Sequence, residues 1–80
     1  KVEEVEVGSV LKMVKVTASD FLVGELVSNI EDANPNVRVI SVNNNTYWCE
    51  NFDRNYKIQK NDLVTFLGST KATDSLFKNL

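Results

Sequence analysis

The stretch YKIQKNDLVTFLG, residues 56–68, decides the fold of this chain. It opens with two apolar residues at alternating spacing, Tyr56 and Ile58, and passes through a polar turn into a run of mostly apolar or β-branched residues. The pattern predicts a short strand, a turn and a buried β-strand. Asn61 lies where the chain must reverse, and Asn accepts the left-handed conformation better than most residues. We expect Gly68 to end the strand where a side chain would hinder a sharp exit.

Composition indicates one small globular domain. The chain has 80 residues, of which 42% are apolar and 25% are charged, a balance too apolar for a disordered tail. The net charge is −2 and the Lys and Arg residues are scattered, which argues against a nucleic-acid partner. No apolar run approaches the roughly 20 residues that a membrane helix requires.

Residue types also narrow the chemistry. The chain has no histidine and a single cysteine, Cys49, so metal sites and the common catalytic dyads are disfavoured. A single cysteine cannot form an internal disulfide, which favours a reducing, cytoplasmic compartment. The sequence also lacks a Gly-rich phosphate loop and a close carboxylate pair on a helix face. We therefore expect neither an enzyme nor a bound cofactor, and a nucleotide or an ion stays open as an effector.

The beginning of the chain predicts strands. Valines alternate with charged residues within 5–7 and 12–16, as in strands with one face covered, and Gly8-Ser9 between them indicates a turn or a bulge. The chain starts at Lys1 with no initiator methionine and no signal-peptide pattern. This start suggests an excised piece of a longer protein or a processed tag. Residues 1–9 are then an N-terminal strand or a linker to an upstream domain, and residues 10–80 form the domain.

A helix is expected after residue 20. Residues 17–20 supply capping side chains, and apolar residues from Leu22 to Ile30 then recur at helical spacing. Gly24 interrupts this stripe, so either the helix starts near Gly24 or another backbone packs closely there. Pro35 prevents the helix from continuing.

Two more strands and a second helix complete the order. Residues 37–42 form the clearest strand, whose alternation places its side chains on two faces: Val37, Val39 and Ser41 on one, and Arg38, Ile40 and Val42 on the other. Asparagines 43–45 form a hairpin loop, and residues 46–49 run back as a partner strand. Ser69 and Thr70 cap the last helix. The order (β)β-α-β-β-β-α predicts an α+β fold, a small mostly antiparallel sheet with its helices packed on one face.

Four motifs recur in this order: FLVG at 21–24, VRVISV at 37–42, NDLVTFLG at 61–68 and TDSLF at 73–77. Together they resemble the TrkA C-terminal domain family (TrkA-C), the C-lobe of the RCK regulators of potassium conductance. That family has a Phe-Val-Gly entry to its first helix, a Val-x-Val-Ile-x-Ile strand, a Gly-Asp turn before an apolar strand and a glycine, and a final helix. The match covers residues 10–80, and it rests on order and spacing because each motif is weak alone.

Two departures bear on the ligand that the resemblance implies. Asn61 replaces the glycine of the family turn, which the left-handed region tolerates. Members that bind cyclic di-adenosine monophosphate commonly have an arginine near the end of the Val-Ile strand, where this chain has Asn43 and Asn44. These amides offer hydrogen bonds but no cation for a phosphate. The candidate ligand-binding residues are therefore Arg38, Val42, Asn43 and Asn44.

Each candidate also has a structural interpretation. Arg38 suits an anionic ligand, but an arginine in a strand is more often a solvent-facing or interface residue, and asparagines in a hairpin are more often turn residues. Asp62 lies beside a turn, where capping or an Asx turn is expected. Tyr47 and Trp48 point to opposite faces of one strand, so one of them can face a partner. Cys49 has no histidine to activate it as a nucleophile.

The resemblance implies a cytoplasmic regulatory domain of a potassium or cation channel or transporter, held at the inner or cell membrane through its parent protein. It implies a homodimer with a small-molecule or ion site at the two-fold interface. The ligand would change the orientation of two lobes and so bias an upstream domain or a membrane-embedded subunit, provided that it binds one arrangement better. Two alternatives remain, a ligand-free assembly module of a membrane transport protein and a catalytic fragment, and the residue types disfavour the second.

Overall fold

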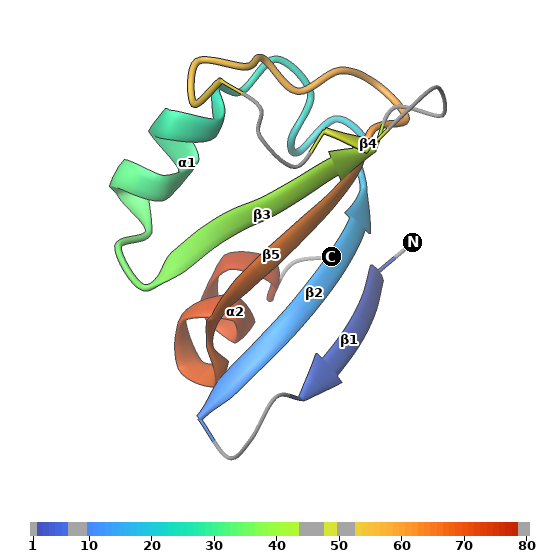
Figure 1. The fold of residues 1–80 in the computed structure, drawn as a ribbon. Helices are drawn as coiled ribbons and strands as arrows, with labels where there is room; N and C mark the ends of the chain where they lie inside the picture. The colour runs from blue at the N-terminus through green and yellow to red at the C-terminus, as the bar shows by residue number, and fades with distance from the viewer. Residues whose placement is uncertain (1, 7–9, 44–47, 50–52, 79–80) are drawn as a thin grey trace.

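A computed structural model of the chain describes residues 2–6, 10–43, 48–49 and 53–78. Seven elements follow one another: β1 (Val2–Glu6), β2 (Leu11–Thr17), α1 (Val27–Ala33), β3 (Val37–Asn43), β4 (Trp48–Cys49), β5 (Leu63–Ser69) and α2 (Thr70–Phe77). The strands form one antiparallel sheet in the order β1-β2-β5-β3-β4 (Figure 1). The predicted α+β fold and its element order are confirmed.

The last strand in the sequence lies at the centre of the sheet. β5 pairs with β2 from Leu11↔Ser69 to Thr17↔Leu63, and it pairs with β3 on its other side. The buried strand predicted from the run after Asn61 is therefore β5, and residues far apart in the sequence meet on both sides of it. Asn61 has a φ of 73°, so the expected left-handed turn residue is confirmed.

The core lies between the sheet and the two helices. On the strands it consists of Val14, Val16, Val37, Val39, Val42, Val64 and Phe66. Phe66 occupies the middle of this face, directly between Val14 and Val39 on the neighbouring strands. Phe77 of α2 packs edge-on against Phe66, with ring centroids 5.1 Å apart, and α1 adds Val27 and Ile30 to the same core.

A bulge in β3 corrects the predicted facing of that strand. The register with β5 shifts between Val39 and Ser41. Two successive steps along β3 therefore correspond to one step along β5, which is a β-bulge. Val42 therefore lies on the buried face with Val37 and Val39, whereas Ile40 is 37% exposed. The prediction that Val42 shares a face with Ile40 was wrong because sequence periodicity alone does not show an inserted residue.

Gly68 does not end the strand. β5 continues to Ser69, and a Cβ atom at Gly68 would lie 2.5 Å from the carbonyl oxygen of Asn36. Glycine is needed here because the backbone entering β3 passes so close. Ser69 is the N-cap of α2, and its Oγ accepts a hydrogen bond from the amide of Ala72 at 3.0 Å, which confirms the predicted cap.

The first helix starts later than predicted. α1 begins at Val27, and its N-cap residue, Leu26, makes no side-chain capping bond. Residues 20–24 form a turn instead, in which Gly24 has a φ of +89°. A Cβ atom there would meet nothing within 4 Å, so the backbone conformation requires glycine, although the Gly24 amide does donate to the carbonyl of Ile58 at 2.8 Å. The helix ends at Ala33, before Pro35, as expected.

The segment expected as a strand around Tyr56 and Ile58 forms only an isolated bridge, Leu26↔Lys57. Its backbone still bonds to the entry of α1, because the Ile58 amide donates to Glu25 and that of Val27 to Tyr56, at 2.9 and 3.0 Å. The partner strand of β3 is confirmed in β4, through Val42↔Cys49 and Asn43↔Trp48. The expectations for Gly8-Ser9, Asn44, Asn45 and Tyr47 lie outside the described residues.

Replacing Phe66 by alanine should lower the free energy of unfolding by about 3–5 kcal/mol, because the ring is fully buried between both neighbouring strands and α2. Leu11→Ala is the control, since Leu11 at the start of β2 is 40% exposed and should cost only about 1 kcal/mol. Urea denaturation measures both. A loss in Phe66→Ala no larger than in Leu11→Ala would contradict the burial of Phe66.

Candidate functional site

The structure separates the four residues that the sequence proposes for a ligand site. Arg38 has a side chain that is 66% exposed, whereas Val42 is 2% exposed and belongs to the core. Asn43 is half-buried at the far end of β3, and Asn44 lies outside the described residues. Of the four, only Arg38 presents an exposed charged group.

Arg38 belongs to a cluster that joins α1, β3 and the loop after β4. The Oε2 atom of Glu31, in the last turns of α1, lies 3.3 Å from Nε of Arg38 and 3.0 Å from Nη1 of Arg54. The same oxygen accepts a hydrogen bond from the backbone amide of Val39 at 2.9 Å. We call Glu31, Arg38, Arg54 and the backbone of Val39 the arginine cluster.

The arginine cluster satisfies the exposed edge of β3. Within the described residues β4 comprises Trp48 and Cys49 and pairs with Val42 and Asn43, and at Val39 two side chains bond to the backbone in the way a neighbouring strand would. Glu31 accepts from the Val39 amide, and Nη1 of Arg54 donates to the Val39 carbonyl at 3.1 Å. Unpaired strand edges invite pairing with other chains, and this arrangement blocks the edge at that point.

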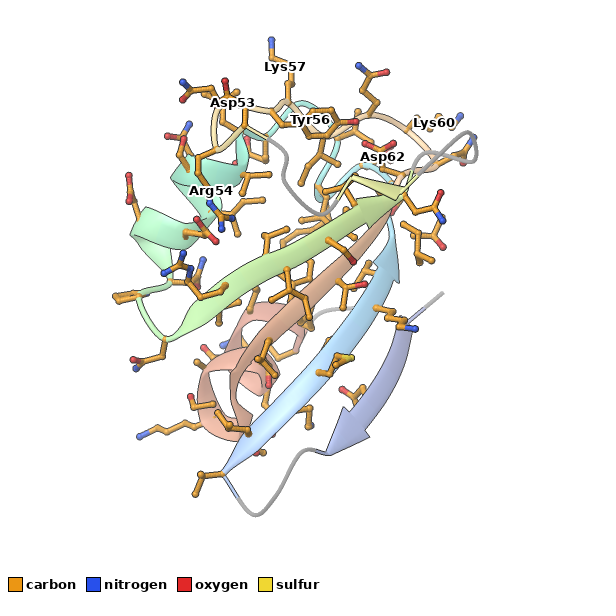
Figure 2. The ribbon with its side chains drawn as sticks, in the orientation of Figure 1. Asp53, Arg54, Tyr56, Lys57, Lys60 and Asp62 are labelled. Atoms are coloured by element: carbon orange, nitrogen blue, oxygen red, sulfur yellow. The ribbon has the colours of Figure 1, made fainter. Side chains whose placement is uncertain are left out.

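Sequence reasoning missed Glu31 and Arg54. Arg54 lies in a loop without periodicity, at the position labelled between α1 and β3 in Figure 2. Its place is fixed locally, because its carbonyl accepts from the amide of Ser28 at 2.8 Å. The only available signal was an arginine in a polar loop, which does not indicate a contact with a helix and a strand.

A second polar group holds the turn before β5. Asp62 is 1% exposed, and its Oδ2 accepts hydrogen bonds from the hydroxyl of Tyr56 at 2.6 Å and the amide of Gln59 at 2.9 Å (Figure 2). Its backbone carbonyl accepts from the amide of Ala18, just after β2, at 2.7 Å. The expected turn role of Asp62 is confirmed, and a buried carboxylate bonded in this way is a structural group.

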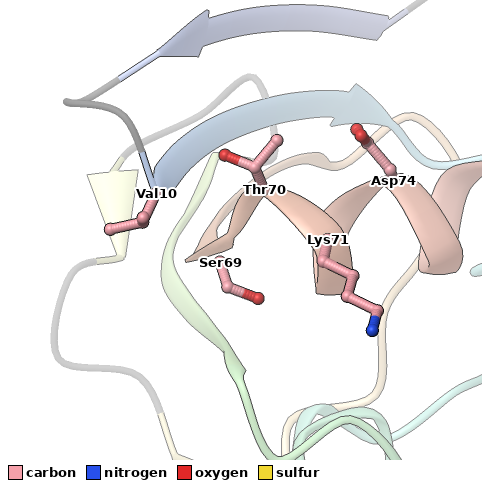
Figure 3. Close-up of a pocket in the computed structure, with 5 residues that line it drawn as sticks. All are labelled: Val10, Ser69, Thr70, Lys71 and Asp74. Atoms are coloured by element: carbon pink, nitrogen blue, oxygen red, sulfur yellow. The ribbon is translucent and has the colours of Figure 1, made fainter.

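An open hollow of about 520 Å³ lies at the start of α2 (Figure 3). Its lining comprises Val10, Ser69, Thr70, Lys71 and Asp74. The amides that a helix N-terminus could offer an anion are partly occupied, since that of Thr70 donates to Val10 and that of Ala72 to Ser69. Asp74 accepts from Nζ of the buried Lys12 at 2.6 Å, which ties the helix to β2.

The sheet has one face that no described helix covers (Figure 1). We call it the outer face, and the alternation of β2, β5 and β3 assigns to it Met13, Lys15, Thr17, Leu63, Thr65, Leu67, Arg38, Ser41 and Asn43. Three of them, Met13, Leu63 and Leu67, are half-buried apolar residues. Thr65 at the centre is 3% exposed, and its hydroxyl has no hydrogen-bond partner among the described residues.

Within the described parts of the chain, no group of three His, Cys, Asp or Glu side chains could hold a metal ion. No helix in these parts is long and apolar enough to cross a membrane. Comparison of the sequence with models of known protein families and with curated proteins found no match.

Removing the buried Asp62 carboxylate should destabilise the fold by about 2–3 kcal/mol in Asp62→Ala, because the hydroxyl of Tyr56 and the amide of Gln59 lose their acceptor in a part-buried site. Tyr56→Phe should cost less than Asp62→Ala, and in the Asp62→Ala background it should cost less than it does alone. Urea denaturation of both variants and the double mutant should give a coupling of at least about 1 kcal/mol.

Asp53→Ala is the control for this cycle. Asp53 is exposed and accepts one bond from the amide of Asn55 at 2.8 Å, so its loss should stay below about 1 kcal/mol. Additive effects of Tyr56→Phe and Asp62→Ala would contradict the bond between their side chains.

Proposed function

We propose that the chain is a cytoplasmic regulatory domain of a potassium or cation channel or transporter, and that it senses an effector as a homodimer. The transport setting comes from the sequence resemblance, and the membrane attachment would run through the parent protein. The element order ββαβββα supports the proposal because the fold is the one that the resemblance implies. The observation that carries it is the outer face of the sheet.

The outer face has the properties of a surface that pairs with its own copy. Two sheets pack face to face when apolar side chains of both meet, and Met13, Leu63 and Leu67 supply such side chains next to hydroxyl groups. A two-fold dimer uses one patch on both partners, so the outer face alone would form both halves of such an interface.

Regulation then requires two arrangements of the dimer. An effector that binds the domain would bias the channel or transporter only if it binds one arrangement of the dimer more tightly than the other. The arginine cluster lies at the edge of the same sheet, and Arg38 pairs across the strands with Leu67 of the outer face. A ligand at Arg38 would therefore act close to the dimer surface.

A ligand-free assembly module is the second candidate, since dimerisation through the outer face would need no ligand. A thermal-shift screen of nucleotides and cations separates the two functions, because a ligand that binds only the folded state must raise the melting temperature. The regulatory function predicts a saturable rise with at least one compound. A flat response to every compound would favour the assembly module.

The chain should sediment as a dimer at micromolar concentration, and Leu67→Lys should shift it to a monomer because the charge enters the apolar part of the outer face. Val23→Lys is the control, since Val23 is also apolar and is 40% exposed on the turn before α1. Sedimentation velocity measures all three proteins. A wild-type monomer up to millimolar protein, or a dimer that survives Leu67→Lys, would contradict the proposed surface.

A further inference from the structure

We infer that the arginine cluster is a binding site for a phosphate group, either free phosphate or the phosphate of a larger molecule. The inference deepens the proposed sensing function and rests on it for its biological purpose. It adds Arg54 to the site and locates the ligand within one protomer, between α1, the edge of β3 and the loop at residues 53–56. Three features of the cluster support it.

The first feature is the convergence of two guanidinium groups. Arg38 and Arg54 come from segments 16 positions apart in sequence, yet each lies within 3.3 Å of the same oxygen atom of Glu31. Groups that both contact one oxygen atom lie close enough together for one small anion to reach both. Planar guanidinium groups bind phosphate oxygens through paired N–H donors, so their convergence suits this ligand class.

The second feature is the direction in which the cluster opens. The side chain of Glu31 is 12% exposed, whereas those of Arg38 and Arg54 are 66% and 47% exposed. The carboxylate therefore lies beneath the two cations, which reach the surface. Arg38 contacts Glu31 through Nε, and its two Nη groups make no hydrogen bond to the part of the chain that the structure describes. A guanidinium carries five N–H donors, so donors remain for a ligand.

The third feature is that the cluster is held in place without a ligand. The Glu31 carboxylate is fixed by the amide of Val39, and Arg54 is fixed by its bond to the Val39 carbonyl and by the backbone bond to Ser28. Such prior ordering reduces the entropy lost on binding. The neighbouring carboxylate of Asp53 accepts a bond from the amide of Asn55 in its own turn.

The test titrates the chain with inorganic phosphate and, separately, with adenosine monophosphate, while backbone amide shifts are followed by NMR. Saturable shifts should appear at Val39 and around Arg54. In Arg38→Gln the affinity should fall at least about tenfold, and Arg38→Lys should restore only part of it because a lysine keeps the charge but loses the fork. Lys60→Gln, which removes an exposed cation at the turn before β5, should leave the affinity unchanged.

The two ligands distinguish the source of the phosphate. Tighter binding of adenosine monophosphate would assign the site to a phosphate ester, and equal binding would assign it to phosphate itself, and both results support the site. No saturable shift at millimolar ligand would overturn the inference. So would equal losses in Arg38→Gln and Lys60→Gln, or shifts that gather at Thr70 to Ala72. Because binding is read on individual amides, its failure is separable from a failure to dimerise, which sedimentation detects.

Discussion

The buried carboxylate of Asp62 is the constraint on which the rest of the sheet depends. It accepts hydrogen bonds from the hydroxyl of Tyr56 and the amide of Gln59, and the backbone carbonyl of Asp62 accepts one from the amide of Ala18. The end of β2, the loop before the turn and the start of β5 therefore meet at one residue. Because strand side chains alternate, a slip of β5 by one position would turn Phe66 away from the helices, so fixing Asp62, the residue before β5, fixes the core face of the whole strand.

The sequence predicted what local patterns control. Alternation found β2, β3 and β5, the turn residue Asn61 took the expected left-handed conformation, and Ser69 capped α2 as its side chain allows. The failures share one physical cause, contacts between segments distant in sequence. Gly68 is required because the carbonyl of Asn36 lies so close. The apolar residues before Val27 have helical spacing in the sequence but lie in a turn before α1.

The candidate site was predictable only in part for the same reason. Arg38 could be singled out because an arginine in a valine-rich strand is unusual. Glu31 and Arg54 acquire their roles at the edge of β3, where their side chains bond to the amide and the carbonyl of Val39. These bonds join segments that meet only in the folded sheet, so the sequence alone does not show them. Val42, chosen with Arg38, proved to be a core residue because the bulge reverses the facing of β3.

The sheet has an edge that side chains satisfy and a face that no described helix covers. At Val39 the edge of β3 is closed by the arginine cluster, while the outer face keeps apolar side chains within reach of a partner. The most direct test is an isotope-filtered NOE experiment on a mixture of labelled and unlabelled chains, which detects only contacts between copies. The account predicts intermolecular contacts among Met13, Leu63 and Leu67 across the two outer faces. Intermolecular contacts confined to the helices or to β1, with none on the outer face, would contradict it.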